Sequence, residues 1–189
     1  MTPKNILLLE DDPLQSQTYR RKLMEHFHGA TVMHLETESD LYAFVTKIKR
    51  GNAVMPDAVV ADVMMPWAQP SKNSPAEPAE VKKGGFSRAG VRCLMRFRGE
   101  VNNSIPWYLF TILDQRGIEN EIEREHIENA VVMNKERPME ELFQEMENRA
   151  GIWRDSEEEE TKYLLNMGMK EAIVAGLATA ISACSGKLD

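Results

Sequence analysis

Cysteine and histidine are scarce in this chain of 189 residues, which has two cysteines and four histidines. Cys93 and Cys184 cannot supply a disulfide framework, which indicates a protein of a reducing, cytoplasmic environment. The histidines, including the pair His26 and His28, have no partners at the spacing that zinc sites use. They are interpreted as surface residues.

Long apolar runs and an excess of basic residues are also missing. No stretch approaches the ~18 consecutive apolar residues of a membrane span, and the opening residues MTPKNILLLEDD lack a secretory pattern. We therefore expect no membrane partner. The 23 basic and 30 acidic residues give a net charge of −7. Because nucleic-acid-binding domains usually carry a basic excess, we expect no nucleic-acid partner.

The composition is that of an ordinary globular protein, with 42% apolar and 28% charged residues. The length fits one domain, predicted over residues 1–150, and an appendage over 151–189. Across residues 5–149, short apolar runs alternate with amphipathic stretches, as in a parallel sheet covered by helices. The pattern predicts an α/β fold in which five strands alternate with five helices in a doubly wound parallel sheet.

The boundaries of these elements follow from local signals. The predicted strands cover residues 6–9, 30–35, 58–61, 107–112 and 130–133, and later helical patterns fall near 91–95, 118–127 and 139–146. The first helix should begin at Pro13 with Asp12 as its cap. Ser39 is expected to cap the second helix.

Residues 66–86 interrupt the alternation with four prolines and predict a long loop. Loops longer than ~12–15 residues are usually functional or disordered. Two interpretations stay open. The segment is a tolerated surface excursion, because long loops cost little stability. Alternatively it is a lid or docking element that places Trp67 near Asp62, the acidic residue directly after the third predicted strand. The basic residues that could then meet a phosphate or an acidic partner are Lys72, Lys82, Lys83 and Arg88.

The appendage, residues 151–189, predicts two extra helices. Ser156 with Glu159 fits a capping box, and a second helix carries an apolar stripe from Ile173 to Cys184. Short helices are marginal without tertiary packing, so this stripe must find a surface. The appendage either covers the domain before it or joins two chains in a homodimer.

Polar side chains follow the predicted strands where each one ends. Glu10, Asp11 and Asp12 follow the first strand, Asp62 the third, Thr111 lies near the end of the fourth, and Lys135 follows the fifth. In an open α/β sheet, ligands bind beyond the carboxyl ends of the strands. Each residue alone has an ordinary explanation as a cap, a packed side chain or a solvated charge. Together they predict an acidic pocket with one lysine and one hydroxyl.

Such a pocket suits phosphoryl transfer. Carboxylates brought close together raise each other's pKa unless a cation lies among them. Mg²⁺ meets this need, since it prefers oxygen ligands and also binds phosphoryl oxygens. One carboxylate can attack phosphorus and carry an acyl phosphate. A lysine and a hydroxyl suit the remaining phosphoryl oxygens, because this reaction depends on positioning and charge neutralisation.

Four segments resemble, in order, the receiver domain of bacterial response regulators: ILLLEDDP, DAVVADVMMP, IPWYLFTI and VVMNKERPMEEL. The resemblance covers about residues 4–150. It implies the flavodoxin-like receiver fold and a phosphoryl group accepted from a sensor histidine kinase or a phosphotransfer protein. It also implies a change in the surface offered to a downstream protein target.

The resemblance assigns roles residue by residue. Asp62 is the implied phosphoacceptor, with Thr111 as the switch hydroxyl and Lys135 as the phosphate-contacting base. The implied Mg²⁺ ligands are Glu10, Asp11, Asp62 and the backbone carbonyl of Met64. Asp12 is assigned to the helix cap.

The sequence also departs from the receiver pattern. Glu136 and Arg137 intervene between Lys135 and Pro138, where receivers have proline directly after the lysine. Ile112 replaces the small residue that usually follows the switch threonine, and it is expected to narrow access to the phosphate. Val132 occupies the place of the aromatic switch residue.

Three functions compete on this basis. The first is a phosphorylation-dependent signalling module without a DNA-binding output domain, since the 39 residues from 151 on are few and acidic. It is not an enzyme beyond its own phosphorylation and dephosphorylation. The second is a pseudo-receiver, a docking scaffold that is independent of phosphorylation. The third, an aspartyl-phosphate phosphatase of the haloacid-dehalogenase class, is disfavoured because Met64 stands where that class has a second aspartate.

Overall fold

A computed structural model describes residues 3–101, 104–112, 115–127 and 129–149. The chain divides into two compact units, one of residues 2–147 and one of Met1 with residues 148–189. The predicted helices of 151–189, and the choice between a cover and a homodimer seam, lie outside the described residues. The domain boundary near residue 150 stays a prediction.

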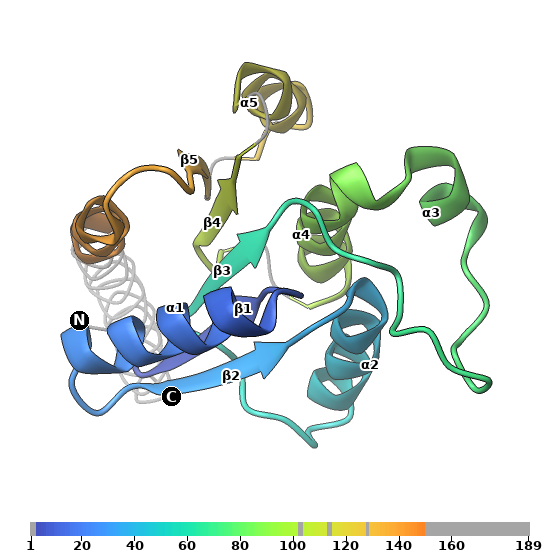
Figure 1. The fold of residues 1–189 in the computed structure, drawn as a ribbon, viewed down its shortest axis with the longest axis horizontal. Coiled ribbons are helices and arrows are strands. Elements are labelled where there is room, and N and C mark those ends of the chain that lie inside the picture. The colour runs from blue at the N-terminus through green and yellow to red at the C-terminus, as the bar shows by residue number, and fades with distance from the viewer. Residues whose placement is uncertain (1–2, 102–103, 113–114, 128, 150–189) are drawn as a thin grey trace, which may run out of the picture. The chain divides into compact units, whose positions relative to one another are not determined.

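One sheet of five parallel strands forms the centre of the first unit, in the order β2-β1-β3-β4-β5 (Figure 1). The strands are β1 Asn5–Leu9, β2 Thr31–Leu35, β3 Ala58–Asp62, β4 Trp107–Thr111 and β5 Ala130–Asn134. Strand β1 pairs with β2 on one side and with the central strand β3 on the other. The predicted doubly wound parallel sheet is confirmed, and each predicted strand is present with small shifts at its ends.

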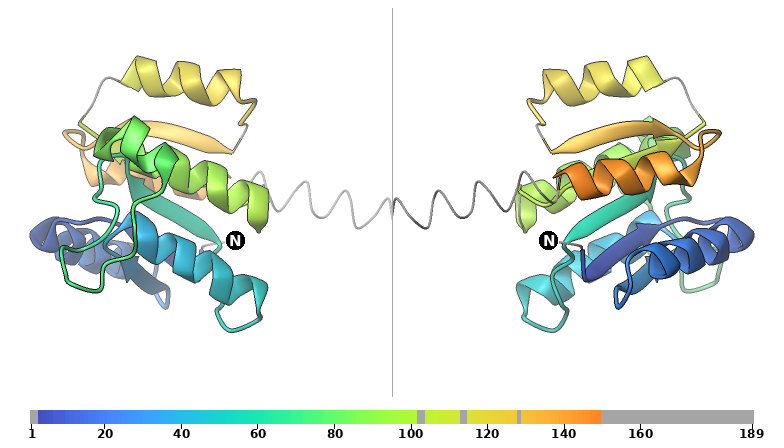
Figure 2. Two further views of the ribbon diagram at one scale, coloured as in Figure 1. Left: turned by 90° about the vertical axis from the view of Figure 1, so that its right-hand side faces the viewer. Right: turned by 90° about the vertical axis from the view of Figure 1, so that its left-hand side faces the viewer.

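Both faces of the sheet are buried under helices (Figure 2). Leu7 and Leu9 of β1 pack with residues of α2 Glu38–Lys49, α4 Ala89–Glu100 and α5 Gln115–Arg124. Ile6 and Leu8 pack with residues of α1 Pro13–His26 and of the helix over 139–149. Burial on both faces explains why the strands read as continuous apolar runs rather than as alternating patterns. Among the described residues, no helix has the length and hydropathy that crossing a membrane requires.

The helix caps confirm one prediction and correct another. Asp12 caps α1, since its carboxylate accepts hydrogen bonds from the backbone N–H groups of Leu14 and Gln15 at 2.8 and 2.9 Å. The prediction that Ser39 caps α2 is wrong. The cap is Thr37, whose hydroxyl accepts from the backbone N–H of Asp40 at 3.2 Å.

The predicted long loop over 66–86 is also corrected, because its last part is helical. It contains α3 Ala79–Gly84, and the 3-10 helix η1 Phe86–Arg88 follows. This segment, residues 66–86, is an insert between β3 and α4, and its start is bonded to α2. There the carbonyl oxygens of Pro66 and Trp67 accept from the backbone N–H groups of Glu38 and Ser39 at 3.1 and 2.8 Å. These bonds satisfy N–H groups that have no partner inside the helix.

A buried ion pair holds α2 and α4 together beside the insert. Glu38 is fully buried, and its two carboxylate oxygens accept from Nε and Nη2 of Arg92 at 2.8 and 2.7 Å. Tyr42 donates to the same carboxylate at 3.3 Å, and its ring meets that of Trp67 edge-on at 5.1 Å. Burial, reinforced by the charge of Glu38, raises the pKa of Tyr42 to about 12. The hydroxyl therefore keeps its proton and remains a donor.

We predict that Gly90→Ala destabilises the protein, because α4 begins against the end of β3. A methyl group at Gly90 would collide with the Asp62 carbonyl oxygen and lie 2.9 Å from Cα of Val63. Overpacking of this kind costs about 1–3 kcal/mol, which denaturant unfolding measures. Gly99→Ala is the control in the same helix, since nothing lies within 4 Å of its added methyl, and it should be neutral or stabilising. Equal stability of the two variants would contradict this account of the packing.

Candidate functional site

The predicted site residues gather at the carboxyl edge of the sheet, beside the point where the strand order reverses. Glu10 and Asp11 follow β1, and Asp62 ends the neighbouring strand β3. They border a cavity of about 630 Å³. The described residues that line it are Glu10, Asp11, Asp12, Gln15, Tyr19, Asp62, Met64, Met65, Pro66, Phe86, Ile112, Lys135 and Glu136. Five of these are acidic and one is basic, so the cavity attracts cations.

Lys135 reaches the acidic residues from the far side of β4. Its backbone N–H donates to the carbonyl oxygen of Thr111 at 2.9 Å, which fixes the turn after β5 to the end of β4. Its ammonium group donates to Glu10 Oε2 at 2.7 Å and to Asp62 Oδ2 at 2.8 Å. The side chain is only 8% exposed. Burial lowers the pKa of Lys135, but the charges and hydrogen bonds of Asp62 and Glu10 outweigh it and raise the pKa above its usual value. The lysine therefore stays charged.

For the carboxylates, unlike for Lys135, burial has the larger effect on the pKa. Burial raises the pKa of Glu10, and this outweighs the hydrogen bond and charge of Lys135, which act in the opposite direction. Burial also raises the pKa of Asp11, with a further contribution from the charge of Asp62. An additional cation among these carboxylates would relieve the cost of keeping both ionised.

Glu10, Asp11 and Asp62 fit a divalent cation. One oxygen from each of the three lies within 4.8 Å of the others. Octahedral Mg²⁺ with bonds of about 2.1 Å holds ligand oxygens roughly 3.0–4.2 Å apart. Small side-chain rotations would thus bring the three oxygens to one ion. Met64 lines the same cavity, and its backbone N–H donates to Asp62 Oδ1 at 3.0 Å, which orients that carboxylate.

Two of the predicted residues lie less directly at the site. Thr111 is fully buried at the end of β4 and is not among the residues that line the cavity. Its role as a switch hydroxyl stays a prediction. Ile112 does line the cavity and is 66% exposed, so the expected crowding of the entrance rests on a side chain that is present there.

The insert reaches the cavity through residues other than the expected one. Trp67 is not a lining residue. Its indole N–H donates to the carbonyl oxygen of Pro75 at 3.0 Å, and it lines a second hollow of about 560 Å³. Pro66 and Phe86 line both hollows. Of the basic residues singled out in the sequence, Lys72, Lys82 and Lys83 are exposed, and Arg88 forms an ion pair with Glu121.

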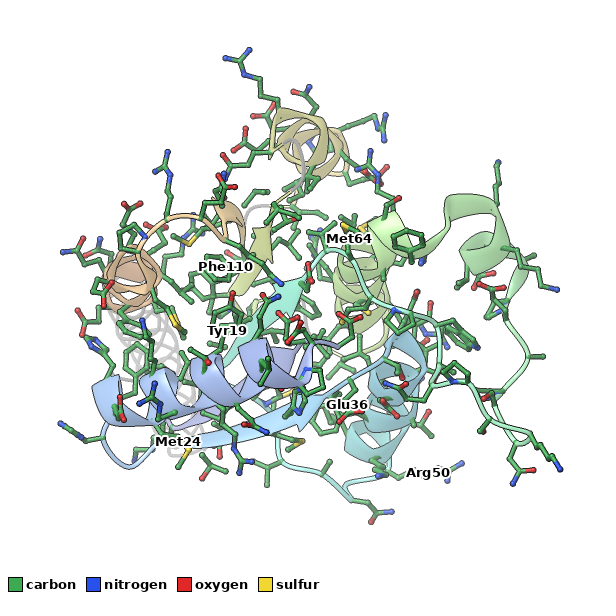
Figure 3. All side chains as sticks on the ribbon, viewed as in Figure 1. Tyr19, Met24, Glu36, Arg50, Met64 and Phe110 are labelled. Atoms are coloured by element: carbon green, nitrogen blue, oxygen red, sulfur yellow. The ribbon has the colours of Figure 1, made fainter. Side chains whose placement is uncertain are left out.

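The sequence pattern predicted no place at the site for Gln15 and Tyr19, which α1 contributes to the cavity, and assigned Tyr19 only to the buried stripe of its helix. Figure 3 shows Tyr19 on α1 facing Phe110 of β4, and the two rings meet edge-on at 5.5 Å. Gln15 Oε1 accepts from the Lys135 ammonium at 3.2 Å and from the Tyr19 hydroxyl at 3.1 Å. The available signal was their i, i+4 spacing in the first turns of the helix that follows Asp11 and Asp12.

The arrangement combines a candidate cation site with a charged lysine beside Asp62, a carboxylate that lines the cavity. A cation held by these carboxylates would neutralise incoming negative charge, and the Lys135 ammonium can contact an oxygen on a group attached to Asp62. Phosphoryl transfer needs this kind of charge neutralisation and positioning.

Comparison with known proteins identifies the fold. No family model matches the sequence, and no curated protein matches it. Among solved structures, the chain is similar to the signal receiver domain of a signal transduction histidine kinase from Syntrophus aciditrophicus, with 20% identity and a TM-score of 0.53. That alignment covers 77% of this chain and 88% of the other.

Two further solved structures have the same fold. One is a DNA-binding response regulator of the LuxR family from Staphylococcus aureus, at 20% identity and a TM-score of 0.52, covering 77% of this chain and 97% of that one. The other is the receiver domain of a sensor histidine kinase from Pseudomonas aeruginosa, described with a magnesium ion coordinated in its active site cleft. It has 16% identity and a TM-score of 0.53, covering 77% of this chain and 95% of that one. The chain therefore has the fold of response regulator receiver domains.

We predict that Mg²⁺ binds at this cluster and that Asp11→Asn weakens its affinity by roughly tenfold or more, because one charged ligand is lost. Isothermal titration calorimetry measures the affinity. Asp12→Asn is the matched control, since asparagine caps a helix about as well as aspartate and Asp12 is outside the three-oxygen cluster. Equal affinities of the Asp11 and Asp12 variants would exclude this ligand set.

The affinity for Mg²⁺ should also depend on pH. The pKa values of Glu10 and Asp11 are raised by burial above their ordinary values of 4.5 and 3.8. Protons compete with the ion for these oxygens, so affinity is full at neutral pH and is lost as pH falls through the raised values. The loss should therefore begin at a higher pH than for exposed carboxylates, and calorimetry between pH 7 and pH 4 would reveal it.

Proposed function

We propose that the protein is a phosphorylation-dependent signalling module of a two-component system, in which Asp62 accepts a phosphoryl group with the help of Mg²⁺. The observation that carries the proposal is the Lys135 ammonium, placed 2.8 Å from Asp62 beside a cluster of three carboxylates. The donor is a phospho-histidine on a sensor histidine kinase or a phosphotransfer protein. The receiver fold supports a signalling protein rather than a classical enzyme.

The chain's residues act on the transfer as follows. A carboxylate oxygen of Asp62 attacks phosphorus, the bond from phosphorus to the donor's imidazole nitrogen breaks, and the imidazole leaves with that electron pair. The Met64 N–H, 3.0 Å from Asp62 Oδ1, holds the carboxylate in position. Lys135 stabilises the charge on the phosphoryl oxygens. Glu10, Asp11, Asp62 and the Met64 carbonyl would hold Mg²⁺, which supplies further charge neutralisation when bound.

The output of the module is proposed to be a protein contact. Thr111 lies at the end of β4 and shares a backbone hydrogen bond with Lys135, so it is placed to respond to the phosphoryl group. A net charge of −7 supports a protein target rather than nucleic acid. We place the protein in the cytoplasm, in keeping with its scarcity of cysteine.

A pseudo-receiver is the second candidate, and the position of Ile112 favours it. This branched side chain stands at the cavity beside Thr111, where it could keep donors out altogether. In that case the protein would dock partners without phosphorylation. The two functions differ in whether Asp62 ever carries phosphate.

We predict that incubation with Mg²⁺ and acetyl phosphate gives one phosphoryl adduct and that Asp62→Asn abolishes it, because the amide is not a competent nucleophile. Intact-mass spectrometry measures the adduct. Asp57→Asn is the control, since Asp57 precedes the same strand, is not a residue of the cavity lining, and accepts hydrogen bonds from the backbone N–H groups of Lys4 and Asn5 at 2.8 Å. Normal labelling of the Asp62 variant would show that the site is wrongly assigned, and an unlabelled native chain would favour the pseudo-receiver.

We predict that Ile112→Ala accelerates labelling by acetyl phosphate, loss of the phosphoryl group, or both. Removing the branched side chain opens the approach to Asp62, and the gain should be several-fold, within about 1.4 kcal/mol of barrier. Quenched-flow labelling measures both rates. Val54→Ala is the control, because Val54 is similarly exposed, at 62%, but is not a cavity residue. Unchanged rates in both directions would remove Ile112 from the gate.

A further inference from the structure

The ammonium group of Lys135 has three hydrogen-bond acceptors among the described residues. They are Glu10 Oε2 at 2.7 Å, Asp62 Oδ2 at 2.8 Å and Gln15 Oε1 at 3.2 Å. A lysine ammonium carries three protons, so these acceptors use its full donor capacity. The group is held from three elements of the fold: the ends of β1 and β3, and the first turn of α1.

Two of these three acceptors change when the proposed reaction takes place. Asp62 becomes an acyl phosphate, and Glu10 and Asp62 are both candidate ligands of the cation. Gln15 is different, because it is neutral and the transfer leaves it chemically unchanged. It is therefore the acceptor that can keep hold of Lys135 throughout.

Gln15 is itself well fixed. Its backbone N–H donates to the Asp12 cap at 2.9 Å. Its Oε1 also accepts from the Tyr19 hydroxyl at 3.1 Å, which turns the oxygen end of the amide toward the lysine. The Tyr19 ring packs edge-on against the Phe110 ring at 5.5 Å. The Lys135 ammonium lies 5.8 Å from the centre of the Tyr19 ring. Tyr19 thus supports both Gln15 and Lys135.

We propose that Gln15, supported by Tyr19, is a positioning residue that holds the Lys135 ammonium toward the phosphoryl group on Asp62. The expected effect on phosphoryl transfer rests on the proposed function, whereas the hydrogen bond from Lys135 to Gln15 does not depend on that function. Gln15 would take up this role when Glu10 and Asp62 turn toward the cation, because the Lys135 side chain would otherwise be free to rotate out of the site.

The variants that test this are Gln15→Leu, which removes the acceptor, and Tyr19→Phe, which removes only its support. Gln17→Leu is the matched control, because Gln17 is an exposed glutamine of the same helix that does not line the cavity. The first measurement is the exchange of the Lys135 ammonium protons with water, followed by NMR on protein with ¹⁵N-labelled lysine at saturating Mg²⁺. We expect exchange to accelerate roughly fivefold or more in Gln15→Leu, since one hydrogen bond to a charged group is lost. The acceleration should be smaller in Tyr19→Phe and absent in Gln17→Leu.

The second measurement is labelling by acetyl phosphate. Gln15→Leu should slow it roughly tenfold while leaving the affinity for Mg²⁺ unchanged. In a Lys135→Gln background the same change should have no further effect, because Gln15 acts only through the lysine. An equal loss in both backgrounds would mean a merely structural role and would overturn the inference.

The two measurements separate the two proposals. If the native chain takes up no phosphoryl group, the proposed function fails, and proton exchange still decides whether Gln15 holds Lys135. If the native chain is labelled but Gln15→Leu matches it in both exchange and labelling, the inference fails and the function stands.

Discussion

Charge balance at the carboxyl edge of the sheet is the constraint on which the site depends. Glu10 and Asp62 come together because β1 and β3 are neighbouring parallel strands, and buried carboxylates without a partner are costly. Lys135 supplies that partner from beyond β4, held there by the hydrogen bond from its backbone N–H to Thr111. The site therefore needs β5 paired in register with β4, and it forms only when β1, β3, β4 and β5 are all in place.

The insert between β3 and α4 is also held by pairing buried polar groups with hydrogen-bond partners. Its first carbonyl oxygens, from Pro66 and Trp67, satisfy the backbone N–H groups that begin α2. The buried Glu38 beside them is matched by two hydrogen bonds from Arg92, and such bidentate geometry offsets the cost of removing both charges from water. With its start fixed in this way, the insert returns to the sheet at Phe86, whose carbonyl oxygen accepts from Met65 at 3.3 Å. A segment that looks dispensable in the sequence thus supplies part of the cavity wall.

The sequence predicted what depends on burial and local capping, and it missed what depends on distant contacts. The strands were recognisable because both faces of the sheet are buried, and Asp12 because Pro13 follows it. Thr37 and Ser39 were equally plausible caps by local chemistry, and α3 spans only six residues, which is too short to show a helical period. Gln15 acquires its role from a lysine 120 positions away, and no local pattern contains that contact. The sequence did predict that Glu10, Asp11, Asp62 and Lys135 lie close together, because the ends of parallel strands must meet at one edge.

Lys135 adds a polar link between two parts of the fold that already touch through the rings of Tyr19 and Phe110. Its backbone is bonded to the end of β4, and its side chain is bonded to Gln15 of α1. In the proposed function, a phosphoryl group on Asp62 replaces one of the partners of the ammonium and adds negative charge. The attraction of the new oxygens for the ammonium would then act on both attachments, while Gln15 keeps its hold on the lysine. In the proposed function, a single charge change at Asp62 would therefore act on β4 near Thr111 and on α1 near Tyr19 at once, which would extend the response to α1 although no aromatic switch residue is present at Val132.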